Sequence, residues 1–305
     1  MSGNHPEQVV ITTVVDNYLD VFEPSTPLIE RAVPGKLQGY LLAGHGLSFL
    51  VEVKQGNQTS RLLMDTGNAF EPFKNNLLAL GRSAAEIDAL FLSHGHPDHY
   101  GGLLGLLQWR QEPLPIYCHP DVFFAKLLVT PRGKIGPWQL DRQQVEASGG
   151  QTKCSAEVEK IWPGVYLTGE IPRRSEFEKP LPGAKIVRNG QEEDDLLMDE
   201  QALVVDLGAK GLVVISGCSH PGIANTIQYA IEITGNKKIY AVVGGLHLAQ
   251  VSDEVLQQTI AALKDSGAEL VVTGHCTGFR PNCQLSRELG STYAVSCVGS
   301  RMTFG

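Results

Sequence analysis

Short apolar runs alternate with turns rich in glycine, proline and polar residues along most of this chain. Such runs are typical of buried β-strands, whereas apolar residues spaced by three or four positions indicate helices. We expect strands at residues 9–15, 47–53, 61–64, 89–92, 115–118, 158–162, 165–168, 202–206, 211–216, 238–243, 269–273, 293–295 and 301–304. We expect helices at residues 73–80, 103–109, 121–128, 223–233, 253–265 and 281–289, with a short helix opening at Ser83. The pattern therefore predicts a layered protein of mixed strands and helices.

Three stretches depart from this pattern. Residues 119–153 are irregular over most of their length, and we expect them to form an elaboration over the functional site, as a lid or a substrate wall. Residues 172–199 are charged and interrupted by proline and glycine, which predicts a solvent-facing excursion. Residues 1–8 are polar, and we expect a loose tail there.

Composition narrows the class of partner. The 305 residues carry a net charge of −8 with a pI near 5.6, which argues against a nucleic-acid binder because such proteins present basic surfaces. No apolar run is long enough to span a membrane, and the N-terminal segment lacks the apolar core of a signal peptide. The six cysteines form no C-x-x-C pair, so we expect reduced thiols in a cytoplasmic protein.

One motif concentrates residues of the kind that bind metals. His94, His96, Asp98 and His99 lie within six residues, directly after an apolar run that predicts a buried strand. In extended backbone the side chains of His94 and His96 point to the same side, because alternate residues share a face. Neutral imidazole nitrogen and carboxylate oxygen suit Zn, Mn or Fe. Such a cluster is hard to explain as packing, and it predicts a metal site.

Three further histidines follow predicted strands in the second half of the chain. His220, His247 and His275 each come within a few residues of a glycine at a strand end. Proteins with alternating strands and helices place their chemistry at such strand ends. We therefore expect at least two of these three histidines to be metal ligands or catalytic groups in one pocket.

Several charged residues near these segments are weaker candidates. Asp65 follows a predicted strand and either caps a turn or orients a metal-binding histidine. His119 precedes a proline and is expected to be a turn residue. Candidates for contact with an anionic substrate are Glu170, Arg173, Arg174 and Arg280, and ordinary surface charge is the alternative for each.

The H-x-H-x-D-H motif resembles that of the metallo-β-lactamase superfamily. The matching segments are residues 63–67, 92–102, 168–173, 216–222, 244–248 and 272–278. The segments Gly-Glu-Ile-Pro-Arg and Gly-Cys-Ser-His further resemble a branch of metal-dependent hydrolases that includes the dihydropterin–ribofuranosylaminobenzene phosphate synthases. The resemblance implies an α+β fold, a four-layer αββα sandwich spanning residues 9–305 as a single domain, with the metal centre at the edge between the two sheets.

The resemblance also suggests a ligand set, with two departures from the superfamily pattern. Many members have a histidine where this chain has Asp199-Glu200, and a bridging aspartate where it has Cys218-Ser219-His220. We assign three histidines to one metal and Asp98 with two histidines to the second. The sets are His94, His96 and His220 for the first metal, and Asp98, His99 and His275 for the second. We expect one or two divalent ions, zinc first, with Mn, Fe and Mg as alternatives.

These features lead to three hypotheses for function. The first is a metal-dependent hydrolase that uses a metal-activated hydroxide on a small, anionic ester, lactone or phosphoester. Asp98 would orient the hydroxide, and His247 would donate a proton, contact the substrate or serve as a spare ligand. The second is a synthase or transferase on a pterin-like substrate, with metal-assisted loss of a phosphate group. The third is a non-catalytic ligand-binding module with a relic metal site.

Overall fold

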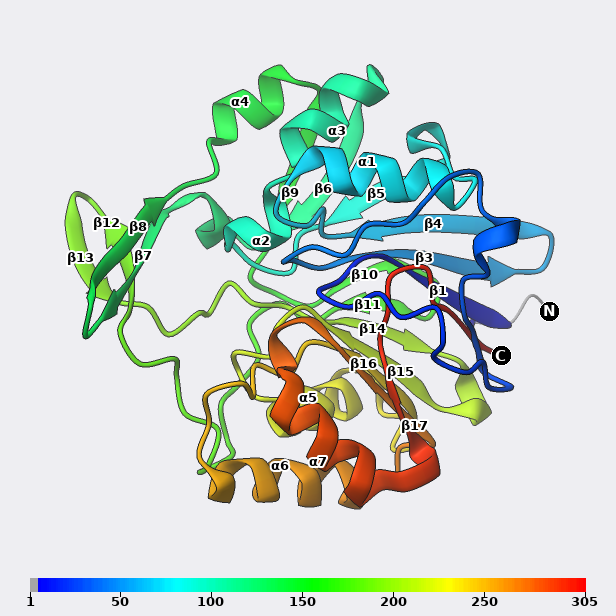
Figure 1. The fold of residues 1–305 in the computed structure, drawn as a ribbon. Coiled ribbons are helices and arrows are strands. Elements are labelled where there is room, and N and C mark those ends of the chain that lie inside the picture. Colours follow the sequence, from blue (N-terminus) through cyan, green and yellow to red (C-terminus); the bar gives the residue numbers. More distant parts are fainter. Residues whose placement is uncertain (1–4) are drawn as a thin grey trace.

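Two β-sheets pack face to face in the computed structural model, which describes residues 5–305, and helices cover the outer face of each sheet (Figure 1). Side chains of both sheets interleave in a shared core, in which Ile11 and Val51 of the first sheet lie in one cluster with Val213 and Ile215 of the second. The structure confirms the α+β, four-layer αββα sandwich that the resemblance implied.

The first sheet has eight strands in the order β2-β19-β1-β3-β4-β5-β6-β9. Its strands are β1 (Gln8–Val15), β2 (Ile29–Glu30), β3 (Ser48–Gln55), β4 (Gln58–Met64), β5 (Ala89–Phe91), β6 (Leu114–Cys118), β9 (Gly150–Cys154) and β19 (Arg301–Phe304). β4, β5, β6 and β9 run parallel. Parallel strands end at the same edge of a sheet, so the residues after β4 and β5 lie close together.

The second sheet has seven strands in the order β10-β11-β14-β15-β16-β17-β18. Its strands are β10 (Glu159–Trp162), β11 (Val165–Leu167), β14 (Leu203–Asp206), β15 (Leu212–Ser216), β16 (Ile239–Gly244), β17 (Leu270–Thr273) and β18 (Tyr293–Val295). β15 to β18 are parallel, so their carboxyl ends share one edge. The loops that follow β15, β16 and β17 carry His220, His247 and His275.

Helices cover the outward faces because alternate strand residues point away from the shared core. Leu50 and Leu63 pack outward under the helices of the first sheet, and Val214 packs outward under those of the second. The helices on the first sheet are α1 (Phe70–Ala79), α3 (Leu103–Arg110) and α4 (Arg142–Ala147), and those on the second are α5 (Ile223–Thr234), α6 (Asp253–Asp265) and α7 (Phe279–Leu289). The short α2 (Pro97–Tyr100) begins within the H-x-H-x-D-H motif.

A third, four-stranded sheet projects from the sandwich (Figure 1) and corrects one prediction. It contains β7 (Ala125–Thr130), β8 (Gly133–Trp138), β12 (Ala184–Arg188) and β13 (Gln191–Asp194). The helix predicted at 121–128 is wrong, because only the 3-10 turn η3 (Pro120–Phe123) precedes β7. β7 is a strand because it pairs with β12, far away in sequence. The elaboration and the charged excursion therefore join in one structure.

The N-terminal segment is more ordered than a loose tail where the structure describes it. Residues 1–4 of the predicted tail lie outside the described residues. His5 Nδ1 lies 3.2 Å from the backbone oxygen of Asp206, Pro6 is buried, and β1 begins at Gln8. None of the helices in residues 5–305 combines the length and apolar character needed to cross a membrane. All six cysteines are free thiols.

Candidate metal centre

The motif after β5 forms one wall of a compact cluster. His94 is fully buried, and its Nε2 lies 3.0 Å from His96 Nδ1. The backbone of His96 is extended, and α2 begins at the next residue, so Asp98 and His99 point from the first turn of that helix. Gly101 allows this tight approach, since a Cβ at that position would overlap the backbone of Asn68.

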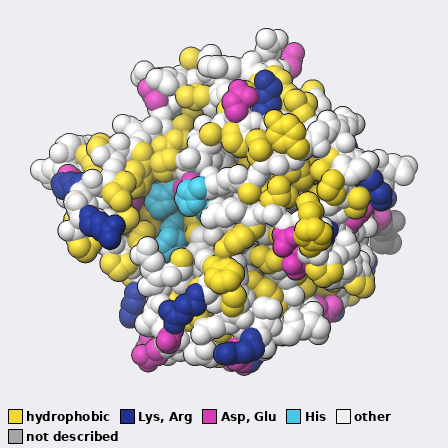
Figure 2. Space-filling view, in the orientation of Figure 1, with side chains coloured by type: hydrophobic (Ala, Val, Ile, Leu, Met, Phe, Trp, Pro, Cys, Tyr) yellow, Lys and Arg dark blue, Asp and Glu magenta, His cyan; other side chains and the backbone are white. Residues whose placement is uncertain are grey.

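The predicted histidines of the second half complete the cluster. The ring centre of His220 lies 4.9 Å from that of His94 and 5.0 Å from that of His96. His275 Nε2 lies 3.2 Å from His99 Nε2 and 3.3 Å from Asp98 Oδ2. Histidine side chains gather at one place on the surface, beside the projecting sheet (Figure 2). The loops after β5, β15 and β17 therefore meet at the edge between the two sheets.

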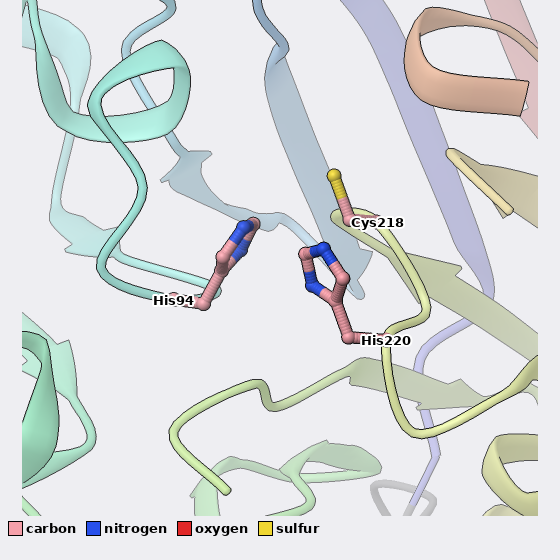
Figure 3. Close-up of side chains that lie close together, drawn as sticks. All are labelled: His94, Cys218 and His220. Atoms are coloured by element: carbon pink, nitrogen blue, oxygen red, sulfur yellow. The ribbon is translucent and has the colours of Figure 1, made fainter. Parts of the chain in front are cut away.

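Cys218 lies between the two histidine pairs and was not predicted as a ligand. Its Sγ lies 3.2 Å from His99 Nε2, and it extends from the same loop as His220, whose ring faces that of His94 (Figure 3). Three sets of three donors include this sulfur, each with all donor atoms within 4.8 Å of one another: His94, Cys218 and His220; His99, Cys218 and His275; and Cys218, His247 and Cys276. The sequence held a signal, because Cys218 stands in the segment where many superfamily members carry a bridging aspartate.

The cluster fits divalent metal ions. Buried polar atoms in proteins nearly always have a partner, yet His220 Nε2 is buried without one. Imidazole nitrogen, thiolate sulfur and carboxylate oxygen together form a donor set typical of zinc. The structure groups His94 and His220 with Cys218, groups His99 and His275 with Cys218, and groups Asp98 with His45 and His275. Among the described residues no such group contains His96, so the two predicted sets, His94 with His96 and His220 and Asp98 with His99 and His275, stay a prediction.

Two buried carboxylates orient the histidines. Asp65 Oδ2 lies 2.7 Å from His99 Nδ1, and Asp65 also accepts hydrogen bonds from the N–H and the hydroxyl of Ser93. Burial alone would lower the pKa of His99, but Asp65 and Asp98 outweigh it and raise that pKa to about 9. Carboxylate partners of this kind fix the ring orientation and tautomer of metal-binding histidines. The structure thus places Asp65 where an orienting role predicts it.

Glu200 holds the loop that carries Cys218 and His220. Its carboxylate accepts hydrogen bonds from the backbone N–H groups of Cys218, Ser219 and His220, and it also pairs with His220 Nδ1. Burial favours a higher pKa, but His220 and these N–H donors outweigh it and lower the pKa of Glu200 to about 2. Glu200 therefore stays ionised and aims His220 Nε2 into the cluster.

A buried lysine links the projecting sheet to the histidine motif. Lys126 of β7 is 1 % exposed, and its Nζ lies 2.7 Å from Asp195 Oδ2 and 3.0 Å from Asp199 Oδ1. The other oxygen of Asp199 accepts a hydrogen bond from the N–H of Gly95 at 2.8 Å. Neither Lys126 nor Asp199 was predicted to take part in the site.

The remaining donors lie at the rim. His247 is half-buried, its ring centre lies 4.5 Å from that of His220, and its N–H donates to Cys276 Sγ at 3.3 Å. His45, which sequence reasoning missed, is exposed and lies 3.1 Å from Asp98 Oδ2. Four residues of the site have left-handed backbone conformations that non-glycine residues rarely adopt: Asp65, Ser219, His247 and His275. Such strain clusters at functional sites.

The structure draws most of the predicted substrate-binding residues away from the cluster. Arg174 pairs with Glu232 and Arg280 pairs with Asp253, both in exposed ion pairs. Glu170 is exposed and contacts His119, whose ring also caps η3, as a turn residue would. Arg173 alone reaches the site, where it donates to the backbone oxygen of His220 at 2.7 Å.

Sequence comparison places the chain among known proteins. The model of the metallo-β-lactamase superfamily matches residues 41–153. A Methanocaldococcus jannaschii protein named 7,8-dihydropterin-6-methyl-4-(β-D-ribofuranosyl)-aminobenzene-5′-phosphate synthase is 37% identical over 265 residues, 85% of this chain and 90% of that protein. A second protein of that organism, the uncharacterized MJ0448, is 28% identical over 80% of this chain and 88% of its own length.

Structural comparison agrees. The crystal structure of Tm1679, described as a metal-dependent hydrolase of the β-lactamase superfamily, is 27% identical with a TM-score of 0.76, covering 97% of this chain and 98% of that one. The metallo-β-lactamase fold protein YhfI from Bacillus subtilis is 14% identical with a TM-score of 0.56, over 97% of this chain and 100% of YhfI, and supports the fold alone.

Proposed function

The chain belongs to the metallo-β-lactamase superfamily, and from this premise we propose that it is an enzyme that holds one or two divalent ions, zinc first, at the cluster of histidines around Cys218. We further propose that it hydrolyses a small, anionic ester, lactone or phosphoester. When bound, such an ion lowers the pKa of its water ligand to about 7 and polarises the substrate oxygen that it contacts.

One observation carries this proposal: of the three donor triads that contain Cys218, two draw side chains from both halves of the chain. One triad adds His94 and His220 to the sulfur, and the other adds His99 and His275. Two adjacent positions of this kind suit hydrolysis, because one can hold the attacking oxygen while the other holds the substrate.

The surrounding residues have separable roles in this proposal. Asp98 Oδ2 lies 3.3 Å from His275 Nε2, at the edge of the second triad, where its carboxylate can accept a hydrogen bond from the attacking hydroxide and orient it. His247 Nδ1 is buried without a partner beside His220, and we assign it the proton donated to the leaving group. Arg173 holds the backbone of His220 and is a positioning residue.

A second candidate function is favoured by the 37% identical relative, which is named as a synthase. In this candidate the site acts on a pterin-like substrate, and a second organic molecule takes the place of water. The protein residues would then stabilise the loss of a phosphate group instead of activating water. The two candidates differ in one measurable respect, because only the synthase requires a second organic substrate.

The test combines metal analysis with turnover. Protein purified without chelators is analysed for bound metal and assayed on phosphoesters, esters and lactones, each with and without pterin-type second substrates. We expect at least one metal ion per chain and turnover in water alone. Replacing His96 with Ala should abolish turnover and lower bound metal, and His275→Ala should remove the second ion selectively. His5→Ala, far from the cluster, is the matched control.

The outcomes separate the hypotheses. Full turnover by the His96→Ala variant would overturn the ligand assignment, and unchanged metal content in His275→Ala would transfer that role to His247. Product formed only with a second organic substrate would establish the synthase. Metal content far below one ion per chain, with no turnover, would indicate a relic site.

A further inference from the structure

A large cavity of about 870 Å³ opens beside the metal centre, between the projecting sheet and the helices of the second sheet. His220 and His247 form its inner end. Its volume lies within the range of pockets that enclose organic ligands of drug size, so it can hold the body of an ester or phosphoester in addition to the reacting group.

Apolar side chains from two parts of the protein, the sandwich and the projecting sheet, line opposite walls of this cavity. Ile223 of α5 and Val255 of α6 lie on the side of the sandwich, and Leu128 and Ile135 lie on the projecting sheet. Ile135 is 56% exposed and Val129, which also lines the cavity, is 38% exposed, so this wall presents more than one apolar side chain to solvent. An apolar ligand between these two walls would cover them.

Two positively charged side chains line the cavity on the side of the projecting sheet. Arg132 lies in the turn between β7 and β8, Lys179 lies in the loop before β12, and both are exposed residues lining the cavity. Within residues 5–305, neither has a carboxylate at ion-pair distance, whereas the nearby Lys134 pairs with Glu192. The one acid lining this cavity, Glu178, is occupied by the N–H groups of Ala224 and Asn225. The cavity thus has a net positive charge on one side.

We propose that this cavity binds the body of the enzyme's own substrate, an elongated molecule with an apolar, ring-like body and a second anionic group. The reacting group lies at His220 and His247, the body lies between α6 and the projecting sheet, and the second anionic group lies at Arg132 and Lys179. This inference rests on the proposed function of the metal centre and adds the substrate class.

The test uses two fluorescent probes that share one body. 8-Anilino-1-naphthalenesulfonate carries a sulfonate, and N-phenyl-1-naphthylamine is its neutral counterpart. We expect one molecule of each probe per chain of metal-loaded protein. The double variant Arg132→Gln/Lys179→Gln should weaken binding of the sulfonate roughly fivefold and leave binding of the neutral probe unchanged, since exposed charge contacts contribute little each. Lys54→Gln/Lys210→Gln makes the same charge change outside the cavity and should alter neither.

A second pair of variants fills the cavity. Val255→Trp on α6 and Val251→Trp in the preceding loop should each weaken both probes at least tenfold, with metal content unchanged, and either one suffices if the other fails to fold. Both probes should also compete with whatever substrate the metal centre turns over. Probe binding unchanged by both tryptophans would overturn the cavity, and binding without competition would overturn its link to the substrate. Probe binding without any turnover would instead refute the proposed function alone.

Discussion

Asp199 accepts a hydrogen bond at 2.8 Å from the backbone N–H of Gly95, the residue between His94 and His96 in the H-x-H-x-D-H motif. The same carboxylate binds the buried Lys126, so a residue of the projecting sheet fixes the backbone from which His94 and His96 extend. Buried charges require partners, and these two charges with Asp195 satisfy one another. Lys126 and Asp199 therefore connect the projecting sheet, which forms one wall of the cavity, to the backbone of the histidine motif.

Replacing Lys126 with Met should be strongly destabilising, because it leaves Asp195 and Asp199 buried without their cation. Removing one partner of a buried ion pair costs about 3–5 kcal/mol in the free energy of unfolding. Chemical denaturation measures this loss. Lys134→Met, which breaks the exposed pair with Glu192, should cost at most about 1 kcal/mol. Equal stability of the two variants would contradict the role of the buried network.

Glu200→Gln keeps the size of the side chain but removes the charge that orients His220. We expect metal affinity to fall about 10–100-fold, the usual effect of losing a partner of a metal-binding histidine. Competition with a chromogenic chelator measures the affinity. Glu192→Gln on the projecting sheet is the control and should bind metal normally. Unchanged affinity in Glu200→Gln would show that the loop is held without this carboxylate.

The absorption spectrum of the cobalt-substituted protein tests whether Cys218 binds metal. A thiolate bound to Co(II) gives an intense charge-transfer band in the near ultraviolet. We expect this band in the unmodified protein and in Cys283→Ser, whose thiol is exposed, and its loss in Cys218→Ser. A band that persists in Cys218→Ser would assign the thiolate to Cys276, which lies within 4.8 Å of Cys218 in a third group of donors.

Asp16 should make the metal-free protein less stable as the pH rises. Its side chain is fully buried behind His275, and its carboxylate accepts a hydrogen bond from the backbone N–H of His275 at 3.0 Å. Burial raises the pKa of Asp16 from 3.8 to about 6. The folded state therefore binds this proton more tightly than the unfolded state, and stability falls between about pH 4 and pH 6. The full difference corresponds to about 3 kcal/mol.

Asp16→Asn removes this titration. Relative to the unmodified protein, the variant should gain stability as the pH rises from 4 to 7, by up to about 3 kcal/mol. Denaturation of both proteins after chelation, at several pH values, gives the difference. A difference that stays constant with pH would contradict the raised pKa of Asp16.

Local pattern predicts most of the sandwich but not the projecting sheet. β15 and β16 are almost entirely apolar, as is typical of strands covered on both faces, and they were predicted within a residue or two. β7 was predicted as part of a helix because the segment has no local sign of its partner. That partner is β12, so the strand is fixed by a contact that no short window of sequence contains.

The same distinction holds at the site. The histidines were predicted because strand ends with imidazoles are unusual, and the structure brings His220 and His275 to the first cluster as expected. Their binding of metal stays a prediction. Cys218, Glu200 and Lys126 were missed because a cysteine, a glutamate and a lysine are ordinary residues in isolation. Burial beside the histidines distinguishes them in the structure, and only Cys218 had a further signal in the sequence, its place in the segment where many superfamily members carry a bridging aspartate.

Two of the donor triads join Cys218 to His94 and His220 or to His99 and His275, and so take side chains from loops of both sheets. An ion held by either triad would link the two halves of the sandwich. Ligands that bind only the folded state stabilise it in proportion to their affinity. Metal supply would then govern how long each copy of the protein survives proteolysis, as well as how fast it works.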